Sequence, residues 1–137
     1  MARFEREREK CVAVTSSEDV VVARSAGREL AAELEFSMGE STLVATAISE
    51  LARNIVIYAG RGEIRICLVS NGVKRGITVI ARDEGPGIAD IDLAMRQGYS
   101  TSGGLGIGLP GVKRIVDEFA IASDVGGTTV TITKWKF

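Results

Sequence analysis

The stretch E-L-A-R-N, from Glu50 to Asn54, decides the fold, and it lies inside a long helical pattern that Ser41 is expected to open. The apolar side of this predicted helix consists of Leu43, Ala47, Ile48, Leu51 and Ile55. Glu50 and Asn54 are four residues apart, so they lie side by side and away from that apolar stripe. The helix, which should end near residues 58–60, therefore presents a carboxylate and an amide oxygen together.

Two interpretations of this pair stay open from the residues alone. Hard oxygen ligands suit Mg²⁺, and a carboxylate within reach of a hydroxyl can accept its proton as a general base. The alternative is the solvent-facing polar side of an ordinary amphipathic helix, which needs no ligand.

A second polar feature closes a predicted strand. From Gly62 the apolar period changes to two, Asn71-Gly72 predicts a hairpin turn, and the return strand covers residues 76–83. Its alternation puts Asp83 on the same face as three apolar residues, Ile77, Val79 and Ala81. A buried carboxylate needs donors, which could be an adenine amino group or the backbone amides of the following Gly-Pro-Gly turn.

The third feature is glycine-rich and spans residues 84–108, with a short helix expected at about 91–97. Within it, Ser100 to Pro110 combines glycines and hydroxyl residues just before a predicted helix, a composition that can cradle phosphate with backbone N–H groups. A flexible surface linker is the alternative. The G-x-G-x-x-G match at 106–111 lacks a preceding strand, and the chain contains no P-loop motif, so neither of those nucleotide folds is predicted.

The remaining elements complete an α/β prediction. A strand at residues 10–16 precedes a helix that Ser16 or Ser17 caps, and a last helix from Pro110 should turn Val112, Ile115, Val116 and Phe119 inward. Two final strands flank Gly126-Gly127. The sum is one domain over 1–137, a two-layer α/β sandwich with helices on one face of a mixed, mostly antiparallel sheet of about five strands. Residues 1–9 are expected to be a charged, frayed lead-in.

Composition and charge argue against several classes of function. A formal charge of -1 provides no field to hold a nucleic-acid backbone, and no apolar run suggests a secretion signal or a membrane span. The two cysteines, Cys11 and Cys67, form no metal pattern and suit reduced thiols. The prediction is a cytoplasmic protein that contacts neither nucleic acid nor membrane.

Together these elements resemble the Bergerat-fold (GHKL) ATPases, the group of gyrase, Hsp90, histidine kinases and MutL, over residues 41–134. Glu50–Asn54 matches the family's N box, Asp83-x-Gly-x-Gly87 the first glycine box, Gly104–Gly108 the second, and Gly127-Thr128 the last. The resemblance implies a Bergerat-type fold, Glu50 as catalytic base, Asn54 as Mg²⁺ ligand and Asp83 as acceptor of the adenine amino group.

The resemblance also implies an ATP site and a lid over residues 88–102. The implied ATP-binding residues are Asn54, Asp83, Gly85, Gly87, Ser102, Gly103, Gly104, Leu105, Gly106, Ile107, Gly108, Leu109 and Thr128.

One departure limits the activity: the chain has no histidine, so it cannot phosphorylate itself on histidine as the histidine kinases do. We expect a stand-alone kinase similar to the short bacterial anti-sigma and switch serine kinases. That resemblance implies ATP-dependent phosphorylation of serine or threonine on STAS-domain scaffold proteins of a stress-signalling complex (stressosome), and later activation of a PP2C-type phosphatase. The alternatives are an anti-sigma kinase that holds a sigma factor directly, and a non-catalytic module whose binding is set by nucleotide.

Overall fold

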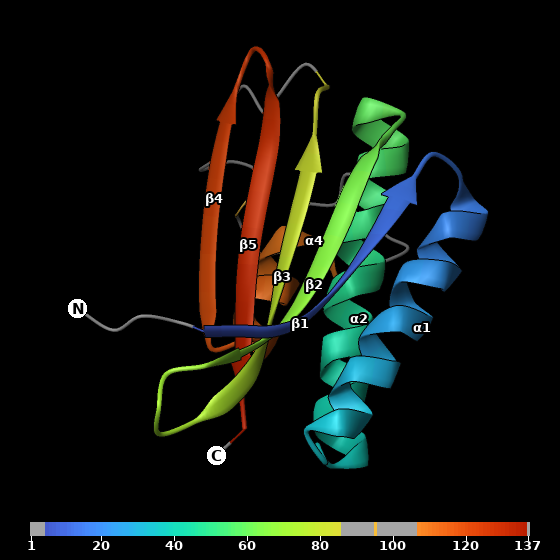
Figure 1. Ribbon diagram of the computed structural model, residues 1–137. Helices are drawn as coiled ribbons and strands as arrows, with labels where there is room; N and C mark the ends of the chain where they lie inside the picture. Colours follow the sequence, from blue (N-terminus) through green and yellow to red (C-terminus); the bar gives the residue numbers. More distant parts are fainter. Residues whose placement is uncertain (1–4, 86–94, 96–106, 137) are drawn as a thin grey trace.

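The structure is a computed structural model that describes residues 5–85, 95 and 107–136 (Figure 1). The strands are β1 (Glu5–Val14), β2 (Gly62–Ser70), β3 (Arg75–Asp83), β4 (Glu118–Asp124) and β5 (Gly127–Trp135). The helices are α1 (Ser17–Glu33), α2 (Met38–Asn54) with its π-helical extension η1 (Ile55–Ala59), and α4 (Gly108–Ile115). The predicted short helix at 91–97 lies outside the described residues, except for Met95.

The strands form one five-stranded sheet in the order β1-β2-β3-β5-β4. Each neighbouring pair is antiparallel, so the α/β prediction is confirmed and its expectation of a mixed sheet is wrong for the described strands. The predicted hairpin joins β2 to β3, where the Asn71 side chain accepts hydrogen bonds from the N–H groups of Val73 and Lys74. Residue register then puts Asp83 opposite Gly62 on one side and Thr128 on the other.

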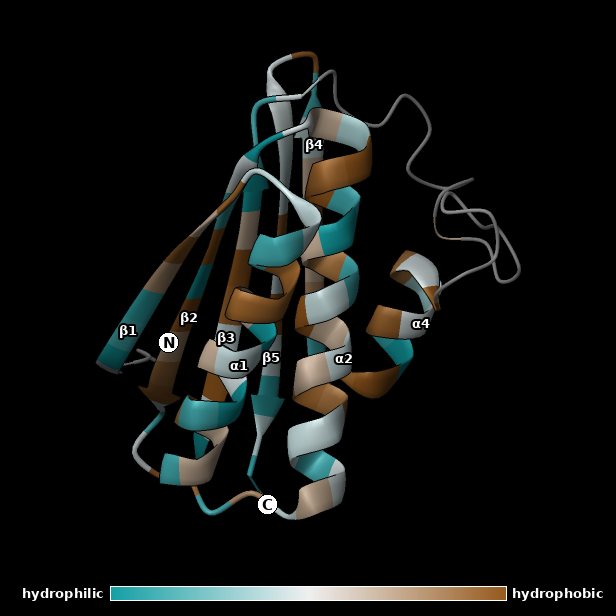
Figure 2. Cartoon of the chain, turned by 90° about the vertical axis from the view of Figure 1, so that its right-hand side faces the viewer, coloured by the Kyte–Doolittle hydropathy of each residue, from teal (hydrophilic) through white to brown (hydrophobic). Residues whose placement is uncertain are grey.

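The helices cover one face of the sheet (Figures 1 and 2). Most of the fully buried core side chains come from α1, α2, β2 and β3, and they include Leu30, Ile48, Leu51, Ile64, Ile66 and Ile77. Each such side chain contributes roughly 1.5–3 kcal/mol by leaving water. This packing fixes α2 against the strands and so sets the direction of its polar residues.

Helix α2 begins earlier than the sequence suggested. Ser37 and Glu40 form a capping box: the Ser37 hydroxyl accepts from the Glu40 N–H at 3.1 Å, and the Glu40 carboxylate accepts from the Ser37 N–H at 2.9 Å. The bond from the Ser37 N–H holds the pKa of Glu40 below its usual value. The prediction of a turn at 36–40 followed by a start at Ser41 is therefore wrong, because the box satisfies the first free N–H groups three residues sooner.

The far end of α2 agrees with the prediction. Its last residue, Asn54, leads into the π-helical turn η1, which Gly60 ends with a φ of 84°. Met38–Ala59 is the one described helix long and apolar enough to cross a membrane, but half of that stretch is buried in the fold. Its composition is that of a core helix.

Two further boundaries differ from expectation. Residues 5–9, expected as part of a frayed lead-in, form the first half of β1. In this strand Arg8 pairs with Glu33 and Lys10 with Glu29 of α1. Phe119 belongs to β4, because α4 ends at Ile115 and the chain becomes extended at Val116. The charged run thus works as a strand from which Arg8 and Lys10 reach acids on a neighbouring helix.

We expect Ser37→Ala to lower the free energy of unfolding by about 1 kcal/mol, since it removes one half of the capping box of α2. Ser16→Ala is the matched control, because Ser16 caps α1 without a side-chain cap bond and its loss should cost less. Urea denaturation measures both, and an equal loss in the two variants would contradict the role given to the box.

Candidate functional site

Glu50 is buried, with 5% of its surface exposed, and both carboxylate oxygens are engaged. Oε1 accepts from Nη1 of Arg53 at 2.8 Å, and Oε2 accepts from the backbone N–H of Gly108 at 3.3 Å. A merely solvent-facing polar side of the helix is therefore the wrong interpretation for Glu50. The carboxylate instead joins α2 to the first residue of α4.

The start of α4 is suited to anions. The first N–H groups of a helix have no intrahelical acceptor, and the helix dipole adds partial positive charge there. Gly108 has a φ of 67°, a conformation that favours glycine, and its N–H already meets the Glu50 carboxylate. Of the predicted loop residues beside it, Ile107 is 43% exposed whereas Leu109 is buried in the core.

Asp83 closes β3 and accepts two backbone hydrogen bonds. Both go to Oδ1, from the N–H of Gly85 at 3.0 Å and from the N–H of Thr128 at 3.3 Å. The turn-capping role that the sequence left open is thus present. Because Oδ2 takes no part in these two bonds, the carboxylate keeps an acceptor that fits an amino group.

Close backbone approaches bring the end of η1 and the ends of β3 and β5 together. A Cβ added at Gly85 would lie 2.7 Å from the Cβ of Ala59, and one added at Gly62 would lie 3.0 Å from Ile55 and 3.1 Å from the Cα of Asp83. A Cβ at Gly127, whose φ is 145°, would overlap the carbonyl oxygen of Asp83. The N-box helix and the Asp83 turn therefore converge at one end of the sheet.

Thr128 and Asn54 complete the described part of the site. Thr128 is buried on β5, and its hydroxyl shares a 2.7 Å hydrogen bond with that of Ser123. Asn54 is partly exposed at the end of α2, one turn beyond Glu50.

A hard amide oxygen at Asn54 fits Mg²⁺, which usually takes few protein ligands and completes its shell with phosphate oxygens and water. The described residues contain no group of three or more His, Cys, Asp or Glu side chains arranged for a metal.

The rest of the predicted site lies outside the described residues. It consists of Gly87, Ser102, Gly103, Gly104, Leu105, Gly106 and the expected lid apart from Met95. Two residues that the sequence analysis missed lie in the described part: Arg53, which bonds Glu50, and Ser123, which bonds Thr128. The position of Arg53, three residues after Glu50 on one helix, was a usable signal.

Comparison with known proteins agrees with this geometry. The family described as histidine kinase-, DNA gyrase B-, and HSP90-like ATPase matches residues 39–136. The chain belongs to this family. The matched segment contains every described residue of the convergent site, including Glu50, Asn54, Asp83 and Thr128.

Relatives within the family are signalling proteins. The chain is 51% identical over 128 residues to the serine/threonine-protein kinase RsbT of Bacillus subtilis (strain 168), covering 93% of this chain and 96% of that protein. It is 30% identical over 127 residues to an anti-sigma F factor of Caldanaerobacter subterraneus subsp. tengcongensis, covering 89% of each. The predicted resemblance to bacterial switch serine kinases is thereby confirmed.

A solved structure shares the fold. The RsbU and RsbW domains of Rv1364c from Mycobacterium tuberculosis match with a TM-score of 0.65 and 20% identity, over 96% of this chain. This chain spans 34% of that longer one.

Gly127→Ala should destabilise the protein by about 1–3 kcal/mol, because the added Cβ would collide with the Asp83 carbonyl at a φ that favours glycine. Gly126→Ala in the same turn is the control, since a Cβ there would meet only Asp124 Oδ1 at 3.2 Å. Thermal and urea unfolding of both variants measure the difference, and equal midpoints would refute the close approach.

Proposed function

We propose that this chain is an ATP-dependent serine/threonine-protein kinase that acts on a partner protein. The observation that carries the proposal is the buried Glu50 carboxylate at the first N–H of α4. A base for the acceptor hydroxyl and a helix start suited to phosphate thereby occupy one place. The similarity to RsbT, a protein named as a serine/threonine kinase, supports the same reaction class.

In this reaction each site residue has a separate role. Glu50 accepts the proton of the serine or threonine hydroxyl while that oxygen attacks the γ-phosphorus of ATP and ADP leaves. Asp83 accepts the adenine amino group, and the start of α4, with the glycine-rich segment before it, donates backbone N–H groups to the phosphates. Thr128 lies beside Asp83 through the bond from its N–H and would border the adenine.

Asn54 would hold Mg²⁺ through its side-chain oxygen. The ion, when bound, neutralises charge on the transferring phosphoryl group. Phosphoryl transfer relies on positioning and electrostatics. The hydrogen bond between Glu50 and Gly108 would contribute to catalysis because it fixes the distance from the base to the phosphate-binding helix.

The proposed partners follow from the resemblance to switch kinases. The substrates are serine or threonine residues of STAS-domain scaffold proteins in a stressosome, and the released kinase binds and activates a PP2C-type phosphatase in a partner switch. The proposed site of action is the cytoplasm. The similarity to RsbT over nearly the whole chain supports this assignment.

A second candidate is an anti-sigma kinase that binds a sigma factor directly, which the 30% identity to an anti-sigma F factor favours. Incubation with labelled ATP and purified STAS-domain proteins, alongside a pull-down probed for sigma factors, separates the two. Label on a STAS protein supports the first proposal. A co-eluting sigma factor with label on its antagonist supports the second, and no label on any protein would contradict both.

Glu50→Gln is expected to retain ATP binding and to lose phosphoryl transfer by about 100-fold or more, because an amide cannot take the hydroxyl proton. Calorimetry with ATP and a transfer assay measure the two properties separately. Retained transfer would refute the assigned base. Loss of both properties would instead show that Glu50 serves the fold. A parent chain that binds ATP without any transfer would favour the non-catalytic nucleotide-gated module.

Asp83→Asn is expected to weaken nucleotide binding by roughly 1.5–3 kcal/mol, the range for a hydrogen bond to a charged group. Glu84→Gln is the matched control, since Glu84 is the exposed neighbour of Asp83 and carries the same charge. Calorimetry compares the ATP affinity of the two variants. An unchanged affinity in Asp83→Asn would mean that Asp83 only caps the turn and does not bind the nucleotide.

A further inference from the structure

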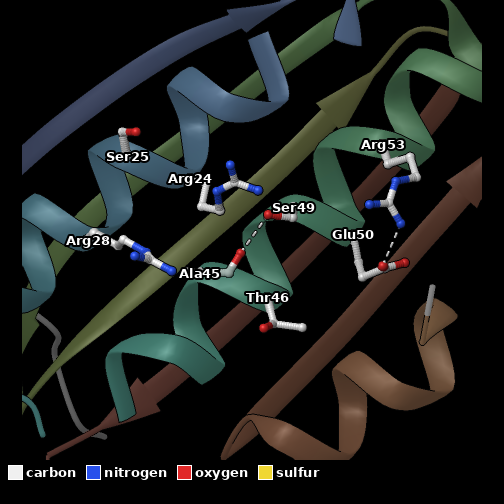
Figure 3. A pocket seen from close by; sticks show the side chains of 8 residues that line it. All are labelled: Arg24, Ser25, Arg28, Ala45, Thr46, Ser49, Glu50 and Arg53. Atoms are coloured by element: carbon white, nitrogen blue, oxygen red, sulfur yellow. Dashed lines mark hydrogen bonds and ion pairs between the residues drawn. The ribbon is translucent and has the colours of Figure 1, made fainter. Parts of the chain in front are cut away.

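A groove of about 450 Å³ lies between α1 and α2 (Figure 3). Arg24 and Arg28 extend into it from α1, and Arg53 lines it from α2 (Figure 3). Ser25, Ala45, Thr46, Ser49 and Glu50 complete its lining. Among the described lining residues, three cations therefore share a small concave surface with a single carboxylate.

The two arginines of α1 are uncompensated on their own helix. They are four residues apart and hence neighbours, an arrangement of like charges that costs a few tenths of a kcal/mol. The positions three and four residues away from either one hold no acid: they are Val20, Val21, Gly27, Ser25, Ala31 and Ala32. No ion pair of the described residues includes Arg24 or Arg28.

Acids of α1 and the acid in the groove already bind groups other than Arg24 and Arg28. On α1, Glu29 pairs with Lys10 and Glu33 with Arg8, both on the strand side of the helix. Asp19 accepts hydrogen bonds from the N–H and hydroxyl of Thr15, which lower its pKa. Glu50, the one acid among the described lining residues, already holds Arg53. The described lining of the groove consequently keeps an excess of two positive charges.

The groove also leads to the proposed base. Glu50 lines it and at the same time bonds Gly108 at the start of α4. A protein segment that lay in the groove would pass beside the carboxylate that must receive the acceptor proton. Exposed arginines next to a reaction centre recognise carboxylates through paired N–H donors.

We propose that this groove docks an acidic segment of the protein substrate, with Arg24 and Arg28 binding carboxylates that flank the acceptor serine or threonine. The proposal rests on the proposed kinase function for the identity of the segment, whereas its charge requirement follows from the groove itself. It makes Arg24 and Arg28 determinants of substrate specificity.

The first test measures binding without catalysis. A short fluorescein-labelled peptide in which glutamates flank one serine is titrated with the full chain at low salt, and fluorescence anisotropy is recorded. The double variant Arg24→Glu with Arg28→Glu should bind it at least about tenfold more weakly. Arg82→Glu is the control for charge reversal: it makes half of the double variant's change in charge, at an exposed residue whose neighbours Ala81 and Asp83 face the helices, so Arg82 faces the opposite side of the sheet.

The second test uses transfer to a STAS-domain protein by the same three chains. We expect the double variant to raise KM with kcat nearly unchanged and to keep its ATP affinity. Equal peptide binding by parent and double variant, equal weakening by Arg82→Glu, or no peptide binding by the parent would each overturn the proposal. Peptide binding that depends on Arg24 and Arg28 without transfer to any STAS protein would keep the docking groove and reject the kinase assignment.

Discussion

The hydrogen bond from the Gly108 N–H to the Glu50 carboxylate is the constraint on which the rest of the site depends. A carboxylate with 5% of its surface exposed is tolerated only because Arg53 and Gly108 supply donors to both oxygens. Leaving a buried polar group without its hydrogen-bond partner costs about 1–3 kcal/mol, and more when the group is charged. The need to satisfy one buried acid therefore fixes the start of α4 against α2.

The same physical rule shapes the other half of the site. Asp83 is held by the N–H groups of Gly85 and Thr128, so the turn after β3 and the first residues of β5 are tied to one carboxylate. Glycine at position 127 is required there because any side chain would strike the Asp83 carbonyl. Two acids, each satisfied by backbone donors from another element, thus organise a site whose elements are far apart in sequence.

Much of this could be predicted from the sequence, because the periods of Leu51 and Ile55 on a helix and of Val79 and Ala81 on a strand are set by burial. The pairing of Glu50 with Asn54 on one face follows from helix geometry alone. The bond to Gly108 could not be predicted, since it depends on a tertiary contact across 58 residues. The sequence places the start of α2 too late because the glycine in the Ser37–Glu40 box suggests a turn. It hides the first half of β1 because the charges there suggest solvent rather than partners on α1.

The distribution of charge shows that the net charge of the chain does not predict the charge of its partner-binding surface. The whole chain carries a formal charge of -1, yet the groove between α1 and α2 is positive. The difference arises because α1 turns Glu29 and Glu33 toward the cations of β1 and turns Arg24 and Arg28 toward α2. Helix periodicity separates the two sets of side chains, but only the packing of α1 between β1 and α2 decides which set is neutralised. A balanced chain can in this way present a local field strong enough to select a partner beside the reacting carboxylate.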